Sequence, residues 1–138
     1  MLSQWFYVSR ANVESIADVQ DIVRVSRSRN AAGGVTGLLV YSGEHFAQVL
    51  EGPADALAAI IASIRADPRH QILWERPLAE VHHRWFGDWS MGYMYNDGLD
   101  TMLASIDASG GLPRLDELVP ALEAALAATC GLSADDIE

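Results

Sequence analysis

The sequence of 138 residues contains a single cysteine, Cys130. One cysteine cannot form a disulfide within the chain or supply a C-x-x-C motif, so the fold must depend on packing. Basic residues are also few, with nine Lys and Arg against nineteen Asp and Glu and a formal net charge of −10. Because no basic run can neutralise phosphates, this composition argues against DNA or RNA as a partner.

Long apolar runs are missing as well. No stretch approaches the roughly 18 apolar residues of a membrane-spanning helix, and the opening residues MLSQWFYVSR lack the charged leader of a signal peptide. We therefore expect a cytoplasmic protein with no membrane partner. Half of the residues are hydrophobic and 20% are charged, which is the profile of one globular domain with a packed core.

Strand-like and helical patterns alternate along the first two thirds of the chain. Segments rich in aromatic and β-branched residues predict strands, and apolar residues at helical spacing predict helices. The expected strands are residues 2–9, 35–41, 45–50, 71–80 and 89–95, and the expected helices are residues 12–30 and 55–66. The order β-α-β-β-α-β with one extra strand predicts an α+β, ferredoxin-like fold, with two helices on one face of an antiparallel sheet. Two helices side by side on a sheet leave a slot that suits a flat ligand.

The segments GLLVY and FAQVL are apolar on both faces, although the two helices can cover only one. From residue 112 onward, leucines at helical intervals predict two short helices, the second beginning at Pro120 and ending at Gly131. We expect residues 1–97 to form a ligand-binding domain and residues 98–138 to form a helical extension that packs on the second face. A second copy of the chain is the alternative cover for part of that face.

Metal binding and hydrolysis find little support in the residues. His82 and His83 are adjacent and have no nearby carboxylate at a metal-ligand spacing, so we interpret them as loop or edge residues and expect no metal site. Ser26 and the other serines lack a nucleophile-elbow context such as G-x-S-x-G.

Three polar side chains are expected to face the slot: Tyr7 on the first strand, Asn30 on the first helix and Gln48 on the third strand. Gln48 shares one strand face with Phe46 and Leu50, and burying its amide without partners would cost roughly 1–3 kcal/mol. The amide is therefore satisfied either by neighbouring backbone or by a ligand. A phenol and two amides are poor acids or bases near neutral pH, so they favour binding of a flat heterocycle with an imide edge over catalysis.

Four stretches together resemble one family: YVS at 7–9, RNAAGGVTGLLVYSGEHFAQVLEG at 29–52, DPRH at 67–70 and RWFGDWSMGY at 84–93. They are similar to the BLUF domain, a bacterial FAD-binding sensor of blue light, over residues 2–95. The resemblance implies a non-enzymatic photoreceptor that binds FAD without a covalent bond. Because the C-terminal extension is too short for a fused output domain, we expect a separate downstream signalling protein, and a homodimer or higher homo-oligomer.

The resemblance also assigns roles to individual residues. Tyr7 would donate an electron and a proton, Gln48 would lie between that phenol and the flavin N5/O4 edge, and Asn30 would bind the imide side of the ring. Met91 and Trp89 match the W-x-M positions on the last strand, which couple the glutamine to the sheet. Light would rearrange the hydrogen bonds of Gln48, giving a red-shifted state that is relayed through the sheet to the C-terminal helices.

Further cofactor contacts follow from the same resemblance. Asp67, Arg69 and His70 match the family's D-x-RH motif at the end of the second helix, where the aspartate and its neighbours help bind the cofactor. Ser26 and Arg29 on the first helix are the remaining expected contacts.

One position departs from the family pattern. Ser63 stands where many members have a basic residue close to the flavin ring, and Arg65 is the nearest basic residue on that helix. Two other functions remain as alternatives. One is an acylphosphatase-type hydrolase, although no arginine-lined phosphate loop follows the first strand. The other is a light-insensitive interaction module with the same fold.

Overall fold

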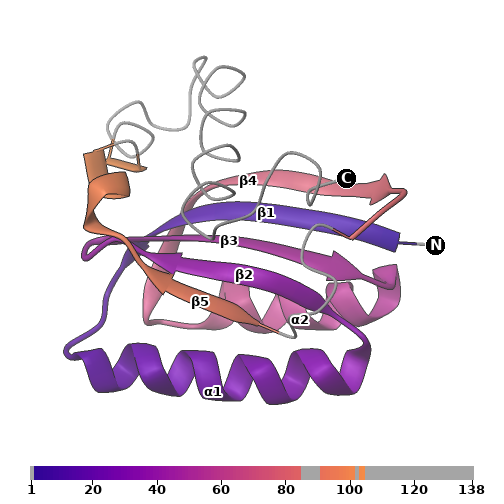
Figure 1. Ribbon diagram of the computed structural model, residues 1–138, viewed down its shortest axis with the longest axis horizontal. Coiled ribbons are helices and arrows are strands. Elements are labelled where there is room, and N and C mark those ends of the chain that lie inside the picture. Colours follow the sequence, from indigo (N-terminus) through magenta and orange to yellow (C-terminus); the bar gives the residue numbers. More distant parts are fainter. Residues whose placement is uncertain (1, 85–90, 102, 105–138) are drawn as a thin grey trace.

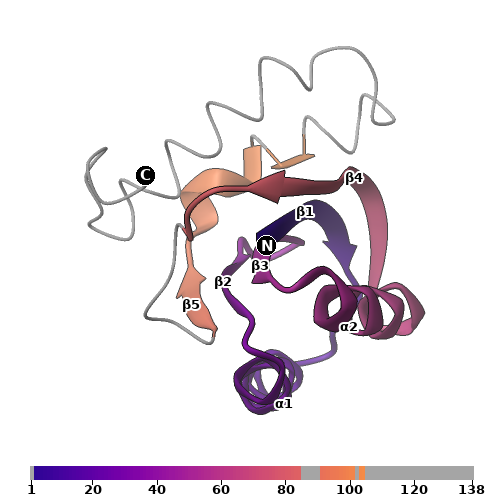
Figure 2. The ribbon, with the colours of Figure 1, turned by 90° about the vertical axis from the view of Figure 1, so that its right-hand side faces the viewer.

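A helix-covered sheet forms the part of the chain that the computed structural model describes, residues 2–84, 91–101 and 103–104. The sheet has the strand order β4-β1-β3-β2-β5, and Figures 1 and 2 show both α-helices on the same face. No helix among the described residues is long and apolar enough to cross a membrane. The elements are β1 (Leu2–Ala11), α1 (Ile16–Gly33), β2 (Thr36–Tyr41), β3 (His45–Gly52), α2 (Ala54–Ala66), β4 (His70–Val81), β5 (Gly92–Tyr95) and the short 3-10 helix η1 (Asp97–Leu99).

The expected order of elements and the α+β fold are confirmed, but the direction of the fifth strand corrects the expected antiparallel sheet. β4, β1, β3 and β2 pair antiparallel, whereas β5 pairs parallel with β2. The end of β4 lies beside Leu2, at the end of the sheet where β2 begins. β5 begins beside Leu38 and runs in the direction of β2. Arg84 already lies at the end where β2 begins, since it donates to Thr36 Oγ1 and to the carbonyl of Gly34, each at 2.8 Å.

The ends of α1 follow from local chemistry. Ser15 is the N-cap residue, and the Asp18 carboxylate accepts a hydrogen bond from the backbone N–H of Glu14 at 2.9 Å. The helix continues past Asn30, where the sequence predicted its end, to Gly33. Gly34 then takes a left-handed conformation with φ of 68°, which glycine adopts without the steric cost of a Cβ.

Alternation along the strands divides the sheet into two buried faces. Trp5, Tyr7 and Leu50 pack in the core beneath the helices with Leu57 of α2. Burial of each such side chain contributes about 1.5–3 kcal/mol to folding. The opposite face is buried as well, with Phe6, Val8, Leu38, Val40, Ala47 and Val49 each at most 2% exposed.

The expected C-terminal extension begins in the described part of the chain. Asn96 N–H donates to the carbonyl of Tyr41 at 2.9 Å, which ties the end of β5 to the end of β2, and Leu103 is fully buried. The two helices predicted from residue 112 onward lie outside the described residues. Their packing on the second face therefore stays a prediction.

Candidate functional site

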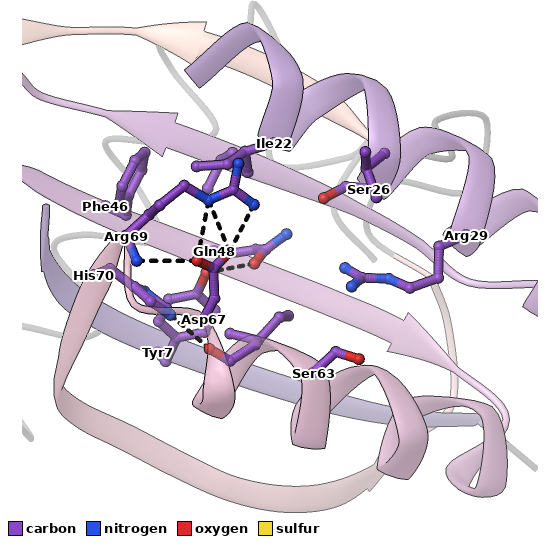
Figure 3. Close-up of a pocket in the computed structure, with 13 residues that line it drawn as sticks. Tyr7, Ile22, Ser26, Arg29, Phe46, Gln48, Ser63, Asp67, Arg69 and His70 are labelled. Carbon is purple, nitrogen blue, oxygen red and sulfur yellow. Dashed lines mark hydrogen bonds and ion pairs between the residues drawn. The ribbon is translucent and has the colours of Figure 1, made fainter. Parts of the chain in front are cut away.

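A pocket lies between α1 and α2 above the centre of the sheet (Figure 3). This is the slot that the order of elements predicted. Side chains from both helices, from the four strands β1 to β4 and from the segment after α2 meet there. The lining residues are Tyr7, Ile22, Val25, Ser26, Arg29, Leu39, Phe46, Gln48, Ser63, Ile64, Asp67, Arg69 and His70.

Tyr7 and Gln48 form the polar centre of the pocket floor. They are direct partners in the β1–β3 register, and alternation turns both toward the helices. Tyr7 Oη donates to Gln48 Oε1 at 2.6 Å in a buried hydrogen bond. That separation is typical of an O–H···O bond and short for an amide nitrogen, so the oxygen end of the amide faces the phenol.

The nitrogen end of the Gln48 amide faces Met91. Gln48 Nε2 lies 3.5 Å from Met91 Sδ, and a thioether sulfur is only a weak acceptor. The amide is 3% exposed, so its strong NH₂ donors have a poor partner on this side. Rotation of the amide would exchange its donor and acceptor ends, giving a second arrangement in the same space.

Burial keeps the Tyr7 hydroxyl protonated. Desolvation raises the pKa of the phenol well above its usual value, the charge of Arg29 opposes this rise, and the charge of Asp67 adds to it. Tyr7 therefore holds its proton throughout the neutral pH range, on a hydrogen bond that points to Gln48.

Asp67 and Arg69 form a tight ion pair at one end of the pocket (Figure 3). Arg69 Nη2 donates to Asp67 Oδ2 at 2.8 Å, and Arg69 Nη1 reaches Asp21 Oδ2 on α1 at 3.2 Å. Burial alone would raise the pKa of the Asp67 carboxyl, but the hydrogen bonds from Arg69 hold it below its usual value. The pair links the end of α2 to α1 and closes this end of the pocket with a carboxylate and a guanidinium.

His70 supports the wall of the pocket. Its Nε2 lies 2.7 Å from the carbonyl oxygen of Ile64, which can only accept, so Nε2 carries hydrogen. Its Nδ1 lies 2.8 Å from Ser9 Oγ. The ring packs edge-on against Tyr7, with centroids 5.6 Å apart. Both ring nitrogens thus have protein partners, and the imidazole contributes its ring surface to the site.

The cation that the second helix lacks at Ser63 is supplied from the first helix. Ser63 lines the pocket, whereas Arg65 pairs with Glu75 and lies over the ring of Trp5, 5.8 Å from its centroid. Arg29 extends from α1 into the pocket (Figure 3). Among the described residues its buried Nε has no hydrogen-bond partner, and burial lowers its pKa. A half-buried guanidinium with a free donor is suited to a carbonyl or anionic group of a ligand.

Most of the residues expected at the site are brought together by the fold. Met91 contacts Gln48 from the side. The expected residues that line this same pocket are Tyr7, Gln48, Ser26, Arg29, Asp67, Arg69 and His70. Asn30 is fully buried on α1 but is not a lining residue, and Trp89 lies outside the described residues.

The apolar lining of the pocket received no role in the sequence analysis. Leu39 is the register partner of Gln48 on β2, and Phe46 shares its face on β3. Alternation had already placed Phe46 on the face of Gln48, and the same alternation along β2 could have placed Leu39 there.

A second polar cluster lies away from the pocket, at the turn between β2 and β3. Asp100 Oδ1 is 2.6 Å from Ser42 Oγ and 3.0 Å from His45 Nδ1. Ligand atoms of Glu44, His45 and Asp100 lie within 4.8 Å of one another, but the Asp100 oxygen already serves as the anchor of the segment after η1. We interpret this cluster as a structural tie between the hairpin and the start of the extension.

The pocket, its Tyr–Gln pair and the helix-covered sheet can be compared with known proteins. Residues 2–92 match the family model described as sensors of blue-light using FAD. The chain belongs to the BLUF family. The dark-state structure of BlrB, a BLUF protein, has a TM-score of 0.74 and 35% identity, covering 93% of this chain and 96% of that one. The photo-activated state of BlsA has a TM-score of 0.66 and 27% identity, covering 77% of this chain and 79% of that one.

Curated relatives carry the BLUF sequence within much longer proteins. Photoactivated adenylate cyclase subunit beta of Euglena gracilis is 37% identical over 81 residues, which is 59% of this chain and 9% of that protein. The blue light- and temperature-regulated antirepressor BluF of Escherichia coli (strain K12) is 39% identical over 57 residues, which is 41% of this chain and 14% of that protein. The family match confirms the sequence-based identification of a blue-light sensor that uses a flavin.

Proposed function

We propose that this BLUF chain is a photoreceptor that binds FAD between α1 and α2 and responds to light by rearranging the hydrogen bonds of Gln48. The observation that supports this mechanism is the buried 2.6 Å bond from Tyr7 Oη to Gln48 Oε1. Within the part of the chain that the structure describes, the other end of the same amide meets a weak sulfur acceptor on Met91. The Gln48 amide thus lines the pocket and contacts two residues: the protonated phenol of Tyr7 through its oxygen, and Met91, next to the edge strand β5, through its nitrogen.

The donor set fits a flavin. A flat ring system with an imide edge and carbonyl oxygens needs neutral donors and acceptors, a cation for electron-rich oxygens and apolar surface for its faces. Gln48 and Arg29 offer donors, and Ile22, Leu39 and Ile64 supply apolar surface around the same pocket. In this proposal Asn30, Ser26, Asp67, Arg69 and His70 complete the cofactor site.

When bound, the flavin supplies the light absorption and the electron acceptor. Tyr7 is the electron donor of the proposal, and its raised pKa keeps the proton on the phenol until it is oxidised. The proton then lies on a hydrogen bond whose acceptor is Gln48. Rotation or tautomerisation of the amide reverses its hydrogen-bonding ends without any covalent change in the cofactor.

The response would leave the pocket through Met91 and, as the sequence suggests, Trp89. Because a close-packed interior transmits small displacements, a new partner for the amide shifts the residues beside it. In this proposal residues 1–97 are the sensor, residues 98–138 are the helical extension that relays the signal, and the output is a separate signalling protein. The protein itself is not an enzyme, acts in the cytoplasm and works as a homodimer or higher homo-oligomer.

Purification in dim light followed by absorption spectroscopy tests the proposal. We expect a bound flavin, identified as FAD by mass spectrometry after its release, and a reversible red shift of its absorption under blue light. Protein that binds no flavin would refute the proposal. Flavin with a spectrum that light leaves unchanged would indicate the light-insensitive module instead.

A further inference from the structure

Met91 is held from two sides at once. Its Sδ is 3.5 Å from Gln48 Nε2, and its backbone carbonyl accepts a hydrogen bond from Arg27 Nε on α1 at 3.0 Å. Met91 is 3% exposed. A single residue thus connects the amide at the centre of the pocket with a guanidinium on the first helix.

The backbone of Met91 lies just before the pairing of β5. The β2–β5 ladder begins with Leu38 and Gly92, and β5 is a strand of four residues at the edge of the sheet. The bond from Arg27 therefore fixes the entry to a short edge strand from the helix side. Arg27 is exposed, but its bond reaches the carbonyl of a buried residue. Charge-assisted bonds from a guanidinium to a carbonyl are stronger than those between neutral groups, so this contact restrains the carbonyl position.

Arg27 lies outside the flavin pocket. The pocket is lined by the α1 face that carries Ile22, Ser26 and Arg29, whereas Arg27 and Val23 line a separate groove with Tyr93 of β5. The helical period places Arg27 on a different side of α1 from Ile22, Ser26 and Arg29, and Val23 lies between these two sides. Arg27 can therefore affect the amide through Met91 and not by touching a ligand in the pocket.

We propose that Arg27 is a positioning residue that sets the distance between Met91 Sδ and the Gln48 amide, and thereby the balance between the two hydrogen-bond arrangements of that amide. The proposal rests on the proposed function, because it concerns the same switch. According to this proposal, α1 takes part in coupling the hydrogen-bond arrangement of Gln48 to the edge strand β5. Loss of the Arg27 bond frees the Met91 carbonyl and weakens the restraint on one side of the amide only.

The test uses Arg27→Met, which keeps the aliphatic stem and helix propensity but removes the donors. Arg24→Met is the matched control, since Arg24 is on the same helix and lines the same groove. Its side chain is 74% exposed and, among the described residues, forms an ion pair with Asp21 at 2.6 Å and no contact with Met91. Arg27→Lys retains a donor and is the conservative variant. Flavin content and thermal unfolding are measured for each variant to establish that all of them fold.

The first readout needs no flavin. In ¹⁵N-labelled, flavin-free protein, the side-chain amide signals of Gln48 are assigned by their loss in Gln48→Leu. We expect Arg27→Met to shift these signals, Arg27→Lys to restore most of their positions, and Arg24→Met to leave them unchanged. Identical Gln48 signals in Arg27→Met and Arg24→Met would overturn the proposal.

The second readout is the thermal return to the dark state after illumination. We expect Arg27→Met to change the recovery rate about tenfold, as for loss of one charge-assisted hydrogen bond, while Arg24→Met recovers like wild type. If the wild type responds to light and Arg27→Met recovers at the wild-type rate, the role of Arg27 is refuted and the proposed function stands. A wild type that shows no light response would refute the proposed function, and the flavin-free readout would still decide on Arg27.

Discussion

Replacing Tyr7 with phenylalanine removes one oxygen from the centre of the pocket and leaves the ring in place. The Tyr7 side chain is 4% exposed, and its hydroxyl donates to Gln48 Oε1 at 2.6 Å. Without the hydroxyl, the buried Oε1 loses this donor, which costs about 1–3 kcal/mol in the free energy of unfolding. The same change removes the oxidisable phenol, so we expect Tyr7→Phe to bind flavin and to lose the normal light-induced shift.

Urea denaturation of the flavin-free protein measures the first effect, and absorption spectroscopy of the flavin-bound protein measures the second. Tyr41→Phe is the matched control, because the Tyr41 hydroxyl donates to the carbonyl of Gly43 at 2.8 Å in an exposed hydrogen bond. Loss of the Tyr41 hydroxyl leaves the exposed carbonyl of Gly43 accessible to water, so we expect the free energy of unfolding to fall by less than about 1 kcal/mol. We also expect an intact light response.

A double-mutant cycle with Gln48→Leu isolates the pair. If the hydrogen bond couples the two side chains, the cost of the double variant differs from the sum of the single costs by about 0.5–3 kcal/mol. Costs that add within about 0.5 kcal/mol would contradict a direct bond between the two side chains. A Tyr7→Phe variant with an unaltered light-induced shift would remove Tyr7 from its proposed role.

Three further predictions concern the frame of the site, its pH dependence and its cation. A Cβ at Gly37 would clash with the backbone carbonyl of Val49 on β3, so we expect Gly37→Ala to disrupt the β2–β3 pairing and to lower the yield of soluble protein. Gly33→Ala is the control, because a Cβ there would have its nearest neighbour at 3.4 Å, and we expect this variant to fold normally. Because the neighbouring guanidinium lowers the pKa of Asp67, this group stabilises the fold above the ordinary carboxyl pKa of about 3.9 and ceases to do so as the pH falls through the lowered folded value. Urea denaturation between pH 3 and 6 should therefore show a shallower acid-induced loss of stability in Asp67→Asn than in wild type, and equal slopes would contradict the assignment. Titration of flavin-free protein with FAD should show weaker binding for Arg29→Met and unchanged binding for Arg65→Met, and equal affinities in both variants would exclude Arg29 as the cation of the pocket.

The sequence by itself determined the order of the elements, the slot between two helices and the shared face of the pocket residues. These features follow from short-range periodicity: alternation on β1 and β3 places Tyr7 and Gln48 on the helix side, and helical spacing turns Ile22, Ser26 and Arg29 of α1 toward the same slot. The motif resemblance then identified the ligand class, which the family match confirmed.

Only the tertiary structure decided which side chains meet across long stretches of chain. The parallel pairing of β5 depends on which end of the sheet β4 reaches, and no local pattern encodes that end. Arg65 pairs with Glu75, and Arg29 on the other helix lines the pocket in its place, together with Arg69, which is paired with Asp67. Arg27 and Met91 are 64 positions apart in the chain. Such contacts depend on how whole elements pack, whereas the sequence periods that guided the prediction extend over only a few residues.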